Sequence, residues 1–286
     1  MNKKEDIRMR KVLIFQGGWD GHEPKAVSAR FARLLEDKGY QAEVYDTQDC
    51  LKEAERLLEY DLIIPCWTMG EIPNEYVENI SRAVAKGTGL AGCHGGMCDA
   101  FRLNTEWQFM TGGQWVSHPG GDGQEYMVNI CAGSSPITDG LEDFPVCSEH
   151  YYLHVDPAIE VLATTRFPLV HYYHISNKPV DMPVAWTKYW GNGRVFYCSL
   201  GHHDDVFDKS PNAQELMLRG MLWAAEGKEA AEKRTGGSRM TRSEKMRVTG
   251  RETDLRDDLQ EINAALIVGR NPVAEALRSG RTVEKI

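Results

Sequence analysis

Apolar, strand-like segments alternate with amphipathic, helix-like segments along the first third of the chain. The pattern predicts helices at residues 23–38, 49–58 and 73–86 and strands at residues 11–16, 41–46, 60–66 and 88–93. Runs without polar interruption, such as Val12 to Phe15, are typical of strands that are covered on both faces. Strands and helices alternating at this spacing predict βαβ units, and therefore a parallel sheet.

Further strands follow in the second half of the chain. They are predicted at residues 125–131, 144–149 and 159–165, with a hairpin of residues 183–187 and 194–200 and a final apolar-striped helix at 211–226. Between them, residues 110–123 are rich in glycine and predict a functional loop. The uninterrupted series favours one α/β domain over residues 8–228 with a mainly parallel sheet.

One strand end differs from all the others. The sequence Gly92-Cys93-His94-Gly95-Gly96 has small neighbours around its central residue, as a tight strand-to-helix corner requires, and the spacing is that of a nucleophile elbow with His94 in the exposed place. A Cys93 thiol activated by His94 is an alternative nucleophile. Because side chains alternate along a strand, we expect Cys93 to point away from the face of His94 and to be buried.

Histidines and a glutamate occur where predicted strands end. His22, His94 and His202 follow strands, Glu149 ends another, and His118 lies in the glycine-rich loop. The carboxyl ends of parallel strands share one edge of a sheet, so these residues are expected to line one polar pocket. Aromatic residues on nearby loops offer flat walls for a sugar: Trp19, Trp67, Trp115 and Tyr151.

Two kinds of chemistry suit this set. In the first, His94 is a general acid or base with Glu149 and His202 as partners, because imidazole titrates near neutral pH. In the second, His22, His94, His118 and His202 bind a divalent metal ion that polarises a carbonyl. A nucleotide cofactor is not expected, because Gly17-Gly18-x-x-Gly21 departs from the G-x-G-x-x-G pattern.

Composition limits the remaining classes. The 286 residues are 42% hydrophobic and contain no membrane-length apolar run, and the seven cysteines show no paired CxxC spacing. These features predict a cytoplasmic protein with free thiols and no membrane partner. The formal net charge of −9 argues against nucleic acid as the main partner, and leaves homo-oligomerisation open.

The C-terminal part has a different composition. Residues 229–286 lack histidine, cysteine and aromatic residues, and residues 233–251 are basic. We therefore expect a flexible tail that begins with a solvated basic linker, in preference to an RNA-binding segment.

Residues 11–226 resemble the trehalose-utilisation, or ThuA-like, family. The resemblance is carried by residues 92–96, by Ser117-His118-Pro119, by residues 148–152, and by segments around Trp186, Phe196 and His202. It implies a class I glutamine amidotransferase-like fold of the flavodoxin type, which is a three-layer, doubly wound architecture. It also implies a role in the metabolism of trehalose or a related disaccharide, as a hydrolase, an isomerase or a non-catalytic sugar-binding or regulatory module. Amidotransferases have cysteine at the corner where His94 stands, so glutaminase activity is not expected, although a cysteine-dependent hydrolase is a further alternative.

Residues 265–280 are similar to the opening strand and helix of the substrate-binding domain of SpoU-type ribosomal RNA methyltransferases. Nothing of the methyl-donor domain of those enzymes follows, so we expect a partial or truncated segment without that activity.

Overall fold

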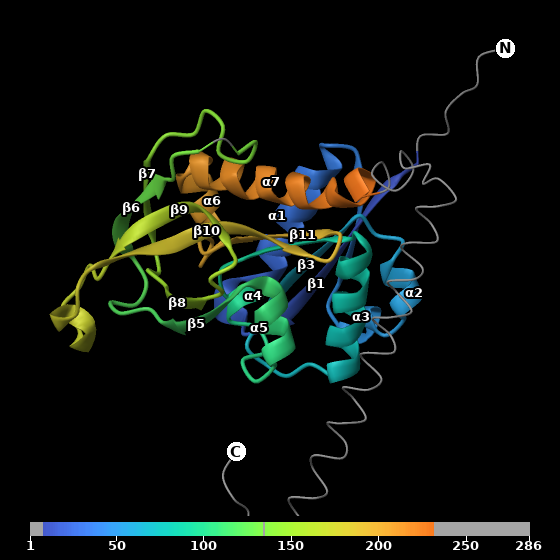
Figure 1. Ribbon diagram of the computed structural model, residues 1–286, viewed down its shortest axis with the longest axis horizontal. Helices are drawn as coiled ribbons and strands as arrows, with labels where there is room; N and C mark the ends of the chain where they lie inside the picture. The colour runs from blue at the N-terminus through green and yellow to red at the C-terminus, as the bar shows by residue number, and fades with distance from the viewer. Residues whose placement is uncertain (1–7, 134, 232–286) are drawn as a thin grey trace, which may run out of the picture. The chain divides into compact units, whose positions relative to one another are not determined.

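A computed structural model of the chain describes residues 8–133 and 135–231. Its main sheet has nine strands in the order β2-β1-β3-β4-β11-β10-β9-β6-β7 (Figure 1). The first five strands of this order are parallel to one another. They are β2 (Tyr40–Tyr45), β1 (Arg10–Gly18), β3 (Leu62–Thr68), β4 (Gly89–Cys93) and β11 (Gly193–Cys198).

The sheet continues beyond β11 through four strands that are each antiparallel to their neighbour. They are β10 (Val180–Trp190), β9 (Glu160–Phe167), β6 (Gln124–Ile130) and β7 (Phe144–Ser148). A tight turn joins β10 to β11, which confirms the predicted hairpin. The sheet is thus mixed, and its parallel half contains the corner at His94.

Helices cover both faces of the parallel half and form a three-layer α/β fold (Figure 1). One face is covered by α1 (Pro24–Glu36) and α7 (Pro211–Ala225), with α6 (Asp205–Lys209) beside α7. The opposite face is covered by α2 (Ala54–Leu57), α3 (Asn74–Lys86), α4 (His94–Cys98) and α5 (Thr105–Thr111). Each layer encloses an apolar core, with Phe31 and Leu216 in the first and Val77 and Trp107 in the second. The predicted fold class is confirmed.

A small second sheet occupies part of the region that the sequence predicts as a glycine-rich loop. Strand β5 (Gly113–Ser117) pairs antiparallel with β8 (Tyr152–Val155). The loop proper is therefore shorter, and extends from His118 to Gly123. Short 3-10 helices lie at η1 (Asp20–His22), η2 (Gln48–Leu51) and η3 (Tyr173–Ser176). No helix within residues 8–133 and 135–231 combines the length and apolar character needed to cross a membrane. Residues 232–286 of the predicted tail, including the segment 265–280, lie outside the described residues.

Candidate functional site

His94 stands at the corner that the sequence predicts. Strand β4 ends at Cys93 and α4 begins at His94, whose φ of 45° is in the left-handed region that non-glycine residues rarely adopt. The next residue needs to be glycine, because a Cβ on Gly95 would lie only 2.4 Å from the His22 ring. The strained corner and its small neighbour bring two imidazoles together, with ring centroids 4.7 Å apart.

A backbone carbonyl fixes the His94 ring. Its Nδ1 lies 2.8 Å from the carbonyl oxygen of Ser199, which follows β11. A carbonyl can only accept a hydrogen bond, so Nδ1 carries the proton. In the neutral ring, Nε2 is then an unprotonated nitrogen that is free to bind a proton or a cation.

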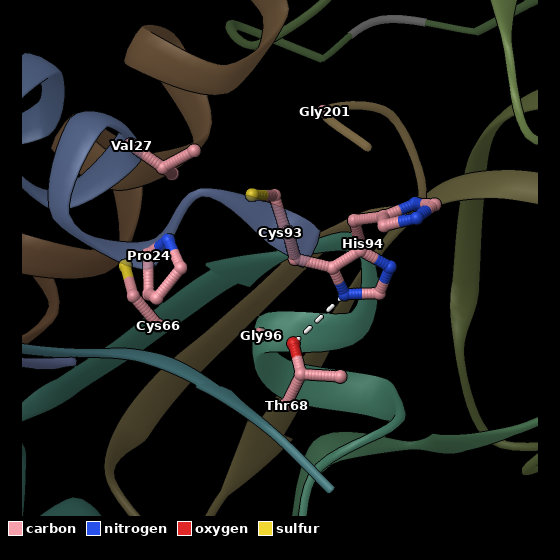
Figure 2. A pocket seen from close by; sticks show the side chains of 9 residues that line it. Pro24, Val27, Cys66, Thr68, Cys93, His94, Gly96 and Gly201 are labelled. Atoms are coloured by element: carbon pink, nitrogen blue, oxygen red, sulfur yellow. Dashed lines mark hydrogen bonds between the residues drawn. The ribbon is translucent and has the colours of Figure 1, made fainter. Parts of the chain in front are cut away.

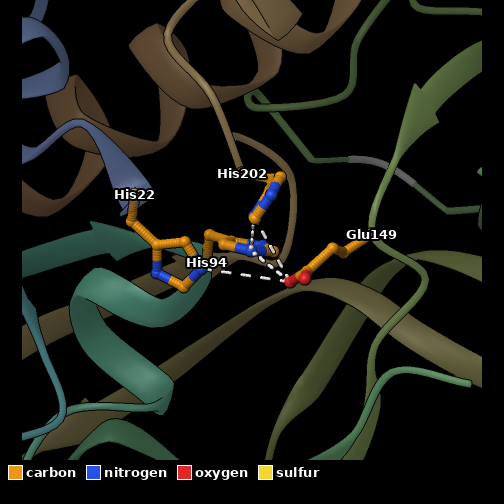
Figure 3. A group of neighbouring side chains, drawn as sticks. All are labelled: His22, His94, Glu149 and His202. Carbon is orange, nitrogen blue, oxygen red and sulfur yellow. Dashed lines mark hydrogen bonds and ion pairs between the residues drawn. The ribbon is translucent and has the colours of Figure 1, made fainter. Parts of the chain in front are cut away.

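Two ligand-type atoms face that nitrogen (Figure 3). Glu149 Oε2 is 3.2 Å from His94 Nε2, and His202 Nδ1 is 3.3 Å from both of them. The three residues are at most 5% exposed. Glu149 comes from the end of β7 and His202 from the loop after β11, so the sheet edge brings together residues far apart in the sequence, as predicted.

His22 completes a four-residue cluster. Its Nε2 is 3.9 Å from Glu149 Oε2, and the ligand atoms of His22, His94, Glu149 and His202 all lie within 4.8 Å of one another. On the other side of the ring, His22 Nδ1 lies 2.8 Å from the hydroxyl of Thr68, at the end of β3. The hydroxyl orients the imidazole so that Nε2 faces the cluster.

Burial keeps these imidazoles uncharged. Burial, together with the neighbouring His94 and His202, lowers the pKa of His22 to about 2. Burial also lowers the pKa of His94 well below its ordinary value, against the opposing effect of the Ser199 hydrogen bond, and it lowers the pKa of His202. Neutral imidazoles beside one carboxylate are the protonation states that metal binding requires.

The distances suit a small divalent ion. Zinc bonds of about 2.0–2.1 Å in tetrahedral geometry separate neighbouring ligand atoms by about 3.3–3.4 Å. The triangle of Glu149, His94 and His202 has edges of 3.2, 3.3 and 3.3 Å. The His94 nitrogen that faces away from the cluster contacts the Ser199 carbonyl, and the corresponding His22 nitrogen contacts the Thr68 hydroxyl. Such contacts are the usual outer support of metal-binding histidines. Two histidines and a glutamate also form the ligand set of some catalytic zinc sites.

Three of the other predicted binding residues, His118, Tyr151 and Trp19, contact this cluster. His118 Nδ1 is 3.5 Å from Glu149 Oε2. In the four-residue cluster, however, Glu149 takes the place that the sequence predicts for His118 as a metal ligand. Tyr151 is buried and stacks on the His94 ring, with centroids 4.0 Å apart. Trp19 is 47% exposed and packs edge-to-face on His22, so it can still contact a ligand. Trp67 is packed against Gly17.

The Cys93 side chain points away from the His94 ring, as predicted (Figure 2). It lines a cavity of about 10 Å³ with Cys66, Val27 and Pro24, and His22 and His94 border the same cavity. Burial raises the pKa of the Cys93 thiol well above its ordinary value, so the thiolate needed for nucleophilic attack is disfavoured. All seven cysteines are free.

Sequence reasoning did not identify three residues that support the site. Ser199 contributes only a carbonyl, so its identity gives no signal. Thr68 is the last residue of an apolar strand followed by a loop, a position that could have marked it. Asp122 is the one acid in the glycine-rich loop, and its carboxylate lies 3.3 Å from His203 and 3.8 Å from His202.

Comparisons with known proteins agree with this fold. A ThuA-like protein from Bacteroides uniformis has 20% identity and a TM-score of 0.61, over 79% of this chain and 94% of its own. A ThuA-like protein from Parabacteroides merdae has 19% identity and a TM-score of 0.61, over 77% and 91%. A β-galactosidase from Rahnella sp. R3 has 17% identity and a TM-score of 0.51, over 79% of this chain but only 32% of its own.

These likenesses concern the fold alone, and no curated protein matches the chain. The sequence profile described as "Trehalose utilisation" (ThuA) matches residues 11–224, about three quarters of the chain. The protein therefore belongs to the ThuA, or trehalose-utilisation, family.

Proposed function

We propose that this protein is a metal-dependent enzyme that acts on trehalose or a related disaccharide or sugar derivative. The observation that carries the proposal is the buried triangle of His94, Glu149 and His202, whose edges match those of a tetrahedral ion site. Family membership supplies the link to trehalose utilisation. The family does not specify the reaction, and we infer hydrolysis or isomerisation because both use a polarised carbonyl, hydroxyl or bound water.

The chain's own residues have separate roles in this proposal. His94, His202 and Glu149 hold the ion, which when bound would act as a Lewis acid toward a sugar oxygen or a water. His22 and His118 lie 3.9 and 3.5 Å from the Glu149 oxygen, so each is close enough to bind the ion or to exchange a proton with a substrate. Trp19 offers the sugar an exposed aromatic surface beside His22.

The metal-free alternative uses the same residues. In it, His94 is a general base or acid and Glu149 orients it. In this role the unprotonated Nε2 is the basic atom, but it faces the Glu149 carboxyl group at 3.2 Å, because the protonated Nδ1 faces Ser199. A carboxylate and an unprotonated nitrogen repel each other, and either a metal ion or a shared proton between them removes the repulsion. We favour the ion because His202 Nδ1 supplies a third ligand atom 3.3 Å from both.

An activity screen tests the proposal. Purified protein, with and without one equivalent of zinc, is incubated with trehalose, related disaccharides and their oxidised forms, while calorimetry records binding. We expect turnover that needs zinc, that is lost in His94→Ala and that persists in His171→Ala, an exposed histidine outside the cluster. Saturable binding without product would instead identify a sugar-binding or regulatory module. Ammonia release from glutamine that depends on Cys93 would identify an amidotransferase-like hydrolase.

A further inference from the structure

The candidate metal centre is covered by a loop built for an unusual backbone path. The loop of residues 118–123 connects β5 to β6, and three of its residues are glycines with positive φ: Gly120 at 99°, Gly121 at 70° and Gly123 at 73°. Other residues adopt such angles only at a cost, so this path depends on glycine. Glycine-rich loops also change conformation readily, because a glycine backbone has more accessible angles.

The centre is closed to a sugar in this conformation. His94, Glu149 and His202 are 1%, 5% and 5% exposed. The two loop side chains that reach toward them are more open, with 38% of the His118 side chain and 50% of the Asp122 side chain exposed. These side chains contact the buried centre and are themselves partly exposed, so displacement of the loop would open a path for a ligand.

Asp122 approaches the ring nitrogen of His202 that faces away from the centre. His202 Nδ1 belongs to the ligand triangle, while its Nε2 lies 3.8 Å from Asp122 Oδ1. A carboxylate at the outer nitrogen of a metal-binding histidine fixes the ring orientation and strengthens it as a ligand. Among the described residues, Asp122 is the acid within 4 Å of this nitrogen, at a separation longer than a direct hydrogen bond.

The segment that Asp122 contacts is itself anchored. Asp122 Oδ2 lies 3.3 Å from His203 Nε2, and the next residue, Asp204, donates its backbone N–H to Glu23 at 2.9 Å. Arg30 on α1 holds the Asp204 carboxylate with two hydrogen bonds of 2.6 and 2.8 Å. The loop therefore meets a fixed surface at His202 and His203, and Asp122 is its point of attachment.

We propose that Asp122 is a positioning residue of the metal centre, which orients His202 through its outer ring nitrogen and so couples ion binding to closure of the 118–123 loop. The inference rests on the proposed metal centre. Asp122, His202 and His203 also form a second set of ligand-type atoms within 4.8 Å of one another. A second ion there would require His202 to bind two ions through its two nitrogens, so we favour the orienting role and make the second ion an outcome of the test.

The test compares the full-length wild-type protein with Asp122→Asn and with Glu125→Gln, which removes an exposed carboxylate near the same loop. Zinc affinity and stoichiometry are measured by competition with a chromophoric chelator. Hydrogen exchange of the amides in residues 118–123 is followed with and without zinc. We expect Asp122→Asn to weaken zinc binding about 10- to 100-fold. We also expect zinc to slow loop exchange in the wild type and in Glu125→Gln, but not in Asp122→Asn.

Each other result contradicts the inference in its own way. Equal zinc affinity and equal loop protection in Asp122→Asn and wild type would refute the role of Asp122 while leaving the metal centre intact. Two zinc ions per wild-type chain, falling to one in Asp122→Asn, would make Asp122 a direct ligand and overturn the positioning role. A wild-type protein that binds no zinc would refute the metal centre itself, and this inference with it.

Discussion

The carboxylate of Glu149 faces the unprotonated nitrogen of His94 at 3.2 Å, because the Ser199 carbonyl holds the ring proton on the opposite nitrogen. Two electron-rich atoms this close, both buried, need a cation or a proton between them. His202 Nδ1 lies 3.3 Å from each of these two atoms, so the three atoms together define three corners of an ion site.

Glu149→Gln should abolish tight zinc binding while preserving the fold. Glutamine has nearly the same shape but no charge, so we expect the zinc dissociation constant to rise by about 100-fold or more. Zinc at 100 times its dissociation constant should stabilise the wild type by about 2.7 kcal/mol and the variant far less. Thermal unfolding with and without zinc measures this difference. Glu142→Gln, at an exposed position, is the control and should behave as the wild type.

Cys93→Ala should leave activity and zinc binding unchanged. The thiol points away from the His94 ring into a small cavity, and burial raises its pKa well above the ordinary value. The variant should lose only about 1 kcal/mol of unfolding free energy, from the missing sulfur atom. A native thiol titration should detect exposed Cys147 before Cys93. Loss of turnover in Cys93→Ala with the fold retained would restore the thiol nucleophile.

The sequence predicts the clustered residues of the site more completely than the residues that hold them in position. His22, His94, Glu149 and His202 follow strands or occupy a glycine-flanked corner, and the parallel sheet brings such positions to one edge. The carbonyl of Ser199 carries no side-chain signal, because every residue has one. The proximity of Asp122 to His202 depends on the path of a loop, which local sequence does not determine.

The fold shows a similar division. Continuous apolar runs identified β1, β3 and β4, whose burial on both faces leaves a clear pattern. The β5–β8 pair was not predicted, because β5 contains glycine and polar residues and both strands are short. Strand order in the antiparallel half also depends on tertiary contacts that alternation alone does not specify.

Arg30→Met should weaken zinc binding through the His202 segment. The Arg30 guanidinium is largely buried and binds Asp204, Asp208 and Gln214, so it fixes the chain just after His202. Methionine keeps part of the volume but removes all these bonds. We expect a loss of about 3 kcal/mol of unfolding free energy, together with a several-fold lower zinc affinity. The control is Arg33→Met, on the exposed side of the same helix, which should change neither quantity.

The Lys188–Asp156 pair should contribute acid-sensitive stability away from the site. Both side chains are largely buried, and the hydrogen bond from Lys188 lowers the pKa of Asp156. Because the folded-state pKa lies below the unfolded value, this stability is present above about pH 4 and is lost as the pH falls through the lowered pKa.

Asp156→Asn should therefore reduce the unfolding free energy at pH 7 by about 2–3 kcal/mol, and its difference from the wild type should shrink below about pH 4. Urea unfolding across this pH range measures both effects. Asp181→Asn breaks the exposed Arg166–Asp181 pair and should cost less than about 0.5 kcal/mol. A pH-independent difference for Asp156→Asn would contradict the assignment.

The most direct measurement is the metal content of untagged, full-length protein, determined by elemental analysis before and after dialysis against zinc. We predict about one divalent ion per chain in the wild type. We predict none in His94→Ala or His202→Ala, with circular dichroism showing that both variants remain folded, and one in the control His171→Ala. Wild-type protein that contains no metal and takes up none, or variants that bind it as the wild type does, would contradict the proposed centre.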